Sequence, residues 1–239
     1  MPADPEPALA TLPRIGVDIV PLARIPALLT PESGPAIHRM VTDEELAQAR
    51  PDPDGVPDPA ALAGRLAAKE AVFKLLGSTG QPLPWPAIQI LRGTGGRPFV
   101  RLSGRAARLA HGAGLGPVDI SISHDGDYAI AVAAAVARPP APPSEPEPEP
   151  ERNPMSSASA SPATSTGIDK VRDWILGRHE DRTELAPDVN IIENRLVDSL
   201  SFVELVYTIE DASGTEIDFD AIDIEDFQSL DTIEKAFFS

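Results

Sequence analysis

The 239-residue chain contains no cysteine, and it also lacks a long apolar run. Without cysteine, neither disulfides nor thiolate metal sites can form. The longest apolar run, residues 128–137, is too short to span a bilayer. The N-terminus lacks the basic segment and apolar core of a signal peptide. We therefore expect a soluble, cytoplasmic protein with no membrane partner.

Basic residues are scarce as well, with 20 Lys and Arg against 37 Asp and Glu and a net charge of −17. The imbalance is concentrated at one end. Residues 1–138 carry a net charge of −1 and residues 139–167 carry −3, whereas residues 168–239 have 6 Lys and Arg against 19 Asp and Glu, a net charge of −13. Such an acidic surface repels nucleic acid and suits a partner with basic residues.

Two common catalytic signatures are missing. There is no Gly-x-x-x-x-Gly-Lys-Ser/Thr loop, which disfavours a nucleotide hydrolase of that type. Ser121 and Ser123 stand beside His124, but the Gly-x-Ser-x-Gly elbow of serine hydrolases is absent. From the residues alone, His124 is more readily explained as a structural or exposed side chain than as a catalytic base.

Composition divides the chain into two domains joined by a linker. Residues 1–13 are rich in proline and alanine and are expected to be disordered. Residues 139–167 are Pro/Glu-rich and then Ser/Ala-rich, which indicates a flexible linker. The domains are therefore expected at 14–138 and 168–239. Met155, within the linker, is compatible with a former start codon, natural or engineered.

The first domain mixes strand and helix patterns, which indicates an α+β fold. An Asp-Gly step between two alternating segments near its end predicts a hairpin. The second domain has helical spacing with a short extra candidate at 219–224, which suggests a small four-helix bundle. The predicted strands are 14–20, 87–91, 98–102, 118–123 and 128–136, and the predicted helices are one starting at 43, then 59–77, 104–112, 168–178, 199–212 and 230–238.

Two carboxylates of the first domain stand at unusual positions. Asp18 lies in an apolar strand, where aspartate is depleted, although a strand end satisfied by backbone amides is an equal alternative. Glu70 falls on the i, i+4 stripe of its helix that should be buried, and a buried carboxylate needs a cation, a metal or a proton. The alternative is a surface pair with Lys74, worth about 0.3–0.5 kcal/mol.

The helix that carries Glu70 also presents Arg65, Lys69 and Lys74 within three turns. Carboxylate oxygens from Asp18 and Glu70 suit Mg²⁺, which usually takes one or two carboxylates plus substrate phosphates. Lysine and arginine suit those phosphates. The combination indicates phosphate chemistry.

Four segments in order, 16–20, 63–74, 96–98 and 121–124, resemble the holo-acyl-carrier-protein synthase family across residues 14–136. The resemblance implies a phosphopantetheinyl-transferase fold. It also implies transfer of 4′-phosphopantetheine from coenzyme A to a carrier-protein serine, with release of 3′,5′-ADP. The family forms trimers with active sites at subunit interfaces, so a homotrimer is expected.

The resemblance also implies a catalytic set of Asp18, Glu70, Lys74 and His124. The residues that match Asp18 and Glu70 hold Mg²⁺ on the coenzyme pyrophosphate, and those that match Lys74 and His124 lie near the phosphates. The general base stays open between Glu70 and a metal-bound water.

Three further positions carry implied binding roles. Arg65 and Lys69 match positions that line the coenzyme site, and Arg24 matches an arginine that meets the acidic helix of the carrier. Pro21 departs from the glutamate common in the family, and residues 51–59 replace a more regular approach to the helix, so these loops are expected to differ.

The last domain resembles acyl carrier proteins across residues 168–239. Asp198-Ser199-Leu200 matches their attachment motif, which makes Ser199 the implied site of covalent 4′-phosphopantetheine. A serine there is often only a helix cap, and Ser201 is the weaker candidate acceptor. The following helix should bury an apolar stripe, Leu200, Val203, Val206 and Ile209, and leave outside the acids Glu204, Glu210 and Asp211.

One chain would then hold a Mg-dependent transferase and its own substrate, loaded in cis or on a neighbouring chain. The linker, roughly 28 residues, spans about 30 Å as a coil and about 85 Å when extended, so either route is within reach. The expected partners are the carrier domain itself and acyl-chain-processing enzymes of fatty acid or polyketide biosynthesis. The alternative is a non-catalytic docking scaffold that presents a carrier loaded by another enzyme.

Overall fold

The computed structural model describes residues 13–30, 34–52, 54–77, 84–137, 166–179, 181–218 and 222–238. The chain divides into two compact units between Pro139 and Pro140. The predicted disordered N-terminus, residues 1–13, lies outside the described residues apart from residue 13. The predicted linker, residues 139–167, lies outside them apart from residues 166 and 167. Within the described ranges, no helix is long and apolar enough to cross a membrane.

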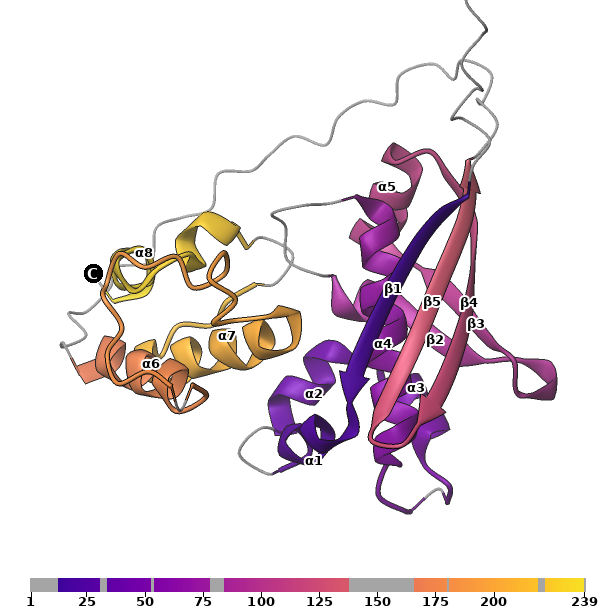
Figure 1. The fold of residues 1–239 in the computed structure, drawn as a ribbon, viewed down its shortest axis with the longest axis horizontal. Coiled ribbons are helices and arrows are strands. Elements are labelled where there is room, and N and C mark those ends of the chain that lie inside the picture. Colours follow the sequence, from indigo (N-terminus) through magenta and orange to yellow (C-terminus); the bar gives the residue numbers. More distant parts are fainter. Residues whose placement is uncertain are drawn as a thin grey trace, which may run out of the picture. The chain divides into compact units, whose positions relative to one another are not determined.

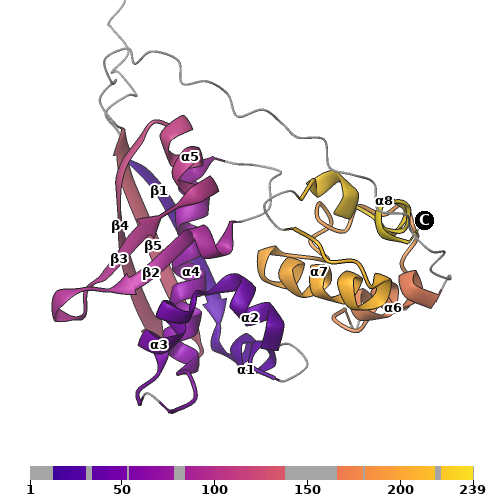
Figure 2. The same cartoon turned by 180° about the vertical axis from the view of Figure 1, so that it is seen from behind.

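The first unit is built on a three-stranded antiparallel sheet in the order β1-β5-β4, with α4 packed on one face (Figures 1 and 2). A two-residue turn joins β4 to β5 and confirms the predicted hairpin. A second sheet pairs β2 with β3. The strands are β1 (Arg14–Pro21), β2 (Ile88–Arg92), β3 (Pro98–Leu102), β4 (Leu115–Asp125) and β5 (Tyr128–Ala137).

The helices of this unit begin and end where their capping residues require. α3 begins after Thr42, which forms a reciprocal capping box with Glu45. α4 begins after Asp58 and ends at Gly77, whose φ of 66° suits glycine. The elements are α1 (Ile25–Leu28), α2 (Gly34–Met40), α3 (Asp43–Ala49), α4 (Pro59–Leu76) and α5 (Gly104–Gly112), with 3₁₀ turns η2 (Leu22–Arg24), η3 (Trp85–Ala87) and η4 (Thr94–Gly96).

The predicted strands and helices of the first unit are confirmed to within a few residues, and so is its α+β class. β4 begins earlier than the alternating pattern indicated, at Leu115, because a register shift between Leu115 and Val118 interrupts the alternation. The sequence therefore showed only the regular part of this strand.

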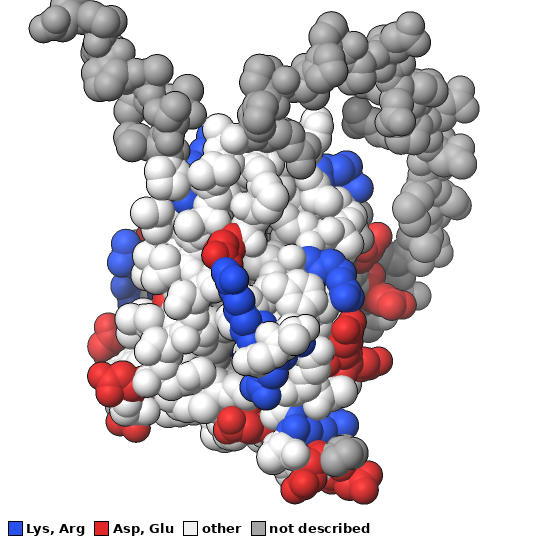
Figure 3. All heavy atoms as spheres, turned by 90° about the vertical axis from the view of Figure 1, so that its right-hand side faces the viewer, with Lys and Arg blue, Asp and Glu red and all other residues white. Residues whose placement is uncertain are grey.

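The apolar face of β1 points away from α4. Ile15, Val17 and Ile19 are 64%, 50% and 52% exposed, whereas the face that carries Gly16 packs on the helix. The same outer face of the sheet continues with further exposed apolar side chains of β5, among them Tyr128, Ile130, Val132 and Val136. Figure 3 looks at the side of the molecule where β4 and β5 lie, and uncharged atoms predominate over it. The described part of the chain leaves these apolar side chains exposed.

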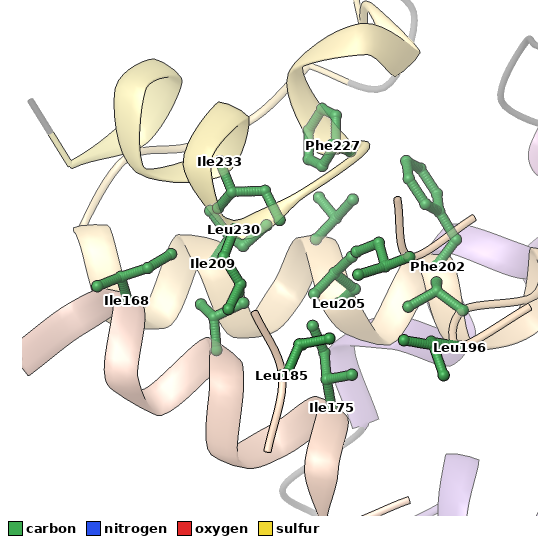
Figure 4. Close-up of a cluster of buried hydrophobic side chains, with 14 of the residues drawn as sticks. Ile168, Ile175, Leu185, Leu196, Phe202, Leu205, Ile209, Phe227, Leu230 and Ile233 are labelled. Atoms are coloured by element: carbon green, nitrogen blue, oxygen red, sulfur yellow. The ribbon is translucent and has the colours of Figure 1, made fainter. Parts of the chain in front are cut away.

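The second unit packs its helices around one apolar core (Figure 4). Its elements are α6 (Thr166–Leu176), α7 (Ser199–Ser213), the 3₁₀ turn η5 (Ile224–Phe227) and α8 (Leu230–Phe237). The helix expected at 219–224 is not seen in the described part of that segment. A 3₁₀ turn begins at Ile224 instead, capped by Asp223, and it carries Phe227 into the core. The four-helix bundle thus stays a prediction.

Candidate active site

The site starts from an unusually close approach of β1 to α4. A Cβ atom added to Gly16 would lie 2.0 Å from the carbonyl oxygen of Ala71. No side chain fits in that space, so the strand backbone rests directly on the helix. Glycine at this position therefore sets how far β1 stands from α4.

The contacts also fix the direction in which β1 crosses the helix. Arg14, at the start of β1, donates a 3.4 Å hydrogen bond to the carbonyl of Leu75 at the end of α4. Gly16 meets the helix at Ala71, one turn earlier. Asp18 is the next residue of β1 on that face, so the strand leads it towards the turn of α4 that carries Glu70.

Asp18 lies inside β1, opposite Ala131 of β5, and its side chain is 13% exposed. Lys74 Nζ lies 2.8 Å from Asp18 Oδ1 and donates a second 2.8 Å hydrogen bond to the carbonyl of Val17. The strand-end interpretation of Asp18 is therefore wrong. Lys74 therefore binds across to the strand.

Glu70 is half-buried on α4, one turn before Lys74. Asp18 and Glu70 thus bring two carboxylates to neighbouring elements. Among the described residues no group of three potential metal ligands occurs. A cation held here would therefore need further ligands from water or substrate, and Mg²⁺ is commonly bound in that way.

Arg65 and His124 meet at a cavity of about 190 Å³ between α4, β2 and β4. The cavity is lined on one side by Gly64 and Arg65 of α4 and on the other by Ile90 and Arg92 of β2. Gly96, Pro98 and His124 also border it. Two guanidinium groups and an imidazole around one cavity make it suitable for an anion.

The Arg65 side chain is only 5% exposed. Its Nη1 donates a 2.9 Å hydrogen bond to the carbonyl of Ala61, but its buried Nε has no hydrogen-bond partner within the described structure. Burial lowers the pKa of Arg65, Glu45 opposes that shift, and Arg92 adds to it. A buried N–H group beside a cavity and without a protein acceptor is expected to donate to a ligand or a water molecule in that cavity.

His124 lies at the end of β4 beside the N-terminal half of α4. Its Nε2 is 2.9 Å from the carbonyl oxygen of Ala60, to which it can donate. A Cβ added to Gly64 would lie 3.0 Å from the same nitrogen. The absence of a side chain at Gly64 thus allows the imidazole to sit against the helix.

Lys69, which was expected to contact the coenzyme, does not line this cavity. Its side chain is 0% exposed, and its Nζ donates to Glu45 Oε2 (2.9 Å) and to the carbonyls of Trp85 (2.8 Å) and Ile88 (2.5 Å). All three ammonium protons are therefore used inside the unit. Burial lowers the pKa of Lys69 to about 8, although Glu45 opposes the shift.

Sequence reasoning missed the second role of Glu45. The sequence predicted a helix that starts at residue 43, but not the 2.8 Å hydrogen bond that Glu45 Oε1 accepts from the backbone N–H of Ile90. No local signal distinguishes a capping glutamate that also binds a distant lysine.

Arg24, the residue expected to meet the carrier, lies half-buried at the end of η2, just after β1.

In the second unit, Ser199 is the first residue of α7, directly after its N-cap Asp198. Ser201 is buried in a capping box, since its Oγ lies 2.7 Å from Asp198 Oδ1 and its backbone N–H donates to the same oxygen at 2.9 Å. Ser199 is half-buried. The geometry therefore favours Ser199 over Ser201 as the serine that another molecule can reach.

The acids of α7 are engaged within the second unit. Glu204 pairs with Arg178, and Asp211 pairs with Lys170. Glu210 Oε1 accepts a 2.7 Å hydrogen bond from a backbone N–H group of the following loop. Glu204 is only 14% exposed, so the expectation that it stays outside is wrong. These pairs leave α7 less acidic towards a partner than its sequence indicated.

Comparison with known proteins matches residues 14–133 to the family model of the 4′-phosphopantetheinyl transferase superfamily. A holo-[acyl-carrier-protein] synthase of Chlorobaculum parvum is 42% identical over 114 residues, which cover 46% of this chain and 87% of that protein. The fatty acid synthase subunit alpha of Schizosaccharomyces pombe is 38% identical over 115 residues, 46% of this chain and 6% of that protein.

Among solved structures, the holo-acyl-carrier-protein synthase of Chronobacterium ammoniagenes in complex with coenzyme A is 30% identical, with a TM-score of 0.44. The similarity covers 54% of this chain and 99% of that one. The family match spans half of the chain, and the sequence identity to the Chlorobaculum enzyme extends over most of that protein. The chain therefore belongs to the 4′-phosphopantetheinyl transferase superfamily, and its first unit is an enzyme of the holo-[acyl-carrier-protein] synthase class.

Proposed function

We propose that the first unit transfers 4′-phosphopantetheine from coenzyme A to Ser199, on the same or a neighbouring chain. The observation that carries the proposal is the buried Arg65 Nε, without a partner in the described structure, at a cavity that Arg92 and His124 also line. Such a cavity suits the phosphate groups of coenzyme A. The relatives named holo-[acyl-carrier-protein] synthase point to the same class of substrate.

In this proposal Asp18 and Glu70 hold Mg²⁺, and the donor set fits because both groups offer the hard oxygen atoms that this ion prefers. When bound, the metal would neutralise charge on the pyrophosphate of coenzyme A. Lys74 already balances the charge of Asp18 at 2.8 Å, and in this proposal its ammonium group would also face the phosphates. The acceptor of the proton of the incoming serine stays open between Glu70 and a water molecule held at the site.

The bonds that change are then defined. The serine Oγ attacks the β-phosphorus of coenzyme A, its proton passes to a base, and the bond from that phosphorus to the oxygen of 3′,5′-ADP breaks. Positioning and charge neutralisation dominate such a transfer. Arg65 and His124 would orient the phosphates from the cavity, and Arg24 would contact the incoming carrier.

The apolar outer face of the sheet supports an assembly of several chains, and we propose a homotrimer. Ile15, Val17 and Ile19 of β1 and their neighbours on β5 form one exposed apolar surface. Large uncovered apolar surfaces of this kind are usually interfaces. Burial of this face would place the first units of three chains side by side.

The second unit is proposed to be the acyl carrier that receives the group. Its support is the position of Ser199 at the first residue of α7, with Ser201 withdrawn into the capping box. The net charge of −13 over residues 168–239 suits basic partners. The Schizosaccharomyces pombe relative gives a precedent for this family segment as a small part of a much longer chain.

A mixing experiment tests the transfer. A Ser199→Ala chain, which keeps the transferase, is combined with a Glu70→Ala chain, which keeps the acceptor, and coenzyme A and Mg²⁺ are added. We expect the phosphopantetheine mass to appear only on the Glu70→Ala chain. Loading of neither chain, with both folded, would exclude transfer between chains, and the proposal would be overturned if the wild-type chain gained no mass either.

The wild-type chain then separates the two routes. For loading in cis, the single-turnover rate stays constant as the chain is diluted, because the tether sets the effective concentration. A rate that rises in proportion to chain concentration would instead indicate transfer between separate assemblies.

A further inference from the structure

Side chains form hydrogen bonds with the backbone groups on the outer edge of β2. β2 pairs with β3 on one side only, in a two-stranded sheet. The hydrogen bond from the N–H of Gly93 to the carbonyl of Arg97 continues the ladder with β3. In an antiparallel pair the backbone groups of successive residues face alternate edges, so the N–H and C=O groups of Ile88, Ile90 and Arg92 face away from β3. Unpaired backbone groups on such an edge need partners.

Three side chains from two helices supply those partners. Lys69 of α4 donates to the carbonyl of Ile88 (2.5 Å). Glu45 Oε1 of α3 accepts from the N–H of Ile90 (2.8 Å), and Gln48 Oε1, one turn later, accepts from the N–H of Arg92 (2.6 Å). The helix spacing of Glu45 and Gln48 thus matches alternate residues of the strand.

These contacts form one connected unit. Lys69 Nζ also binds Glu45 Oε2, and both side chains are fully buried. Glu45 Oε2 accepts in addition from the backbone N–H of Thr42 (2.9 Å), which fixes the start of α3. The ion pair therefore ties α3, α4 and β2 together at one point, and Gln48 extends the tie to the end of the strand.

The strand held in this way is a wall of the cavity. Ile90, Leu91 and Arg92 line it from β2, opposite Arg65 and His124. A shift of β2 along or away from α3 would move Arg92 relative to Arg65. Phosphate groups bound by two guanidinium groups require a fixed separation between them.

We propose that Lys69, Glu45 and Gln48 are positioning residues, which complete the outer edge of β2 and thereby set the place of Arg92 in the coenzyme site. None of the three lines the cavity, so they act through the strand. The inference rests on the proposed function, because it takes coenzyme A as the ligand of the cavity.

Gln48 gives the sharpest test, since it lies near the surface and its replacement leaves the buried ion pair intact. In the full chain, Gln48→Ala should raise the KM for coenzyme A roughly three- to tenfold, the loss that corresponds to one hydrogen bond, with kcat unchanged and the melting temperature lowered by no more than about 5 °C. Gln48→Glu keeps an acceptor oxygen and should restore the wild-type KM. Gln89→Ala is the matched control, because Gln89 lies on the same strand but contacts Arg101, away from the cavity.

Hydrogen exchange at the N–H of Arg92 supplies a second readout, which should quicken in Gln48→Ala and not in Gln48→Glu. An unchanged KM in Gln48→Ala, or a KM in Gln48→Glu as high as in Gln48→Ala, would overturn the inference. So would a joint fall of kcat and melting temperature, because it would mean a purely structural role. A wild-type chain that neither binds nor uses coenzyme A would instead overturn the proposed function.

Discussion

Replacement of Gly16 by alanine tests the contact on which the proposed site is built. The added Cβ would lie 2.0 Å from the carbonyl oxygen of Ala71, and that oxygen belongs to the backbone of α4 and cannot rotate away. Strand and helix must therefore separate by about 1 Å or more to reach ordinary contact distances. Overpacking of this kind costs about 1–3 kcal/mol.

For a unit of this size, that cost corresponds to a fall in melting temperature of roughly 5–15 °C. The effect on transfer should be larger than the effect on stability. The separation would move Asp18 away from Lys74, from which it now stands 2.8 Å, and a displacement of about 1 Å at a reacting group can cost about 10²-fold in rate.

Calorimetric unfolding and the initial rate of carrier loading measure the two effects separately. Gly112→Ala is the matched control, because a Cβ there meets no atom within 4 Å and the residue ends helix α5. This control should keep the wild-type rate and melting temperature or gain slightly in stability. A Gly16→Ala chain that melts and reacts like the wild type would refute the account of the β1–α4 contact.

Three more predictions concern charged and capping groups. Lys74→Met should reduce kcat/KM by about 10²-fold, because the cation beside Asp18 is lost. The unfolding free energy should fall by less than about 1 kcal/mol, because the lysine is half exposed. Equal losses of activity and stability would contradict this. Lys69 has a folded-state pKa of about 8, below its ordinary 10.5, so the burial cost of its charged form is fully present below pH 8 and is relieved between pH 8 and 10.5. The unfolding free energy of the wild type relative to Lys69→Met should therefore rise across that range in denaturant titrations, and a flat or falling difference would refute the sign. Ser201→Ala should lower the unfolding free energy by about 1 kcal/mol through loss of the capping box. Peptide mass mapping should still find the variant loaded at Ser199. An unloaded but folded variant would point to Ser201 as the acceptor.

The two lysines of α4 show which feature of the site the sequence could not predict. Lys69 and Lys74 both follow from the same helix pattern, and both were assigned to the coenzyme site. The fold separates them, because Lys69 faces β2 and Glu45 inside the unit, whereas Lys74 crosses to Asp18 at the surface. Helical spacing gives the direction of a side chain around its own helix but not the element that it meets.

The sheet shows a second limit. The alternation of β1 correctly predicted a strand, with Asp18 and the apolar residues on opposite faces. The usual assumption that the apolar face is turned to the core of the same chain is wrong here, because the glycine face packs on α4. A strand with an exposed apolar face thus has the same alternating sequence as a strand whose apolar face is turned to the core.

In the second unit the sequence prediction succeeded where the pattern was local. The start of α7 at Ser199 and its span follow from sequence alone. The pairs that Arg178 and Lys170 form with the acids of α7 depend on how α6 packs on α7, which no local pattern contains. The acidity of a helix in sequence thus overstates the charge that it offers to a partner.

The central claim is that this chain loads its own carrier serine, and an intact mass measurement tests it most directly. The full chain, first shown to be unloaded, is weighed before and after incubation with coenzyme A and Mg²⁺, beside the Ser199→Ala and Glu70→Ala variants. The account predicts one added phosphopantetheine on the wild type and none on either variant alone. No added mass on the wild type would contradict the account and favour a docking scaffold whose carrier another enzyme loads, and an arm on Ser199→Ala would contradict the assignment of the acceptor.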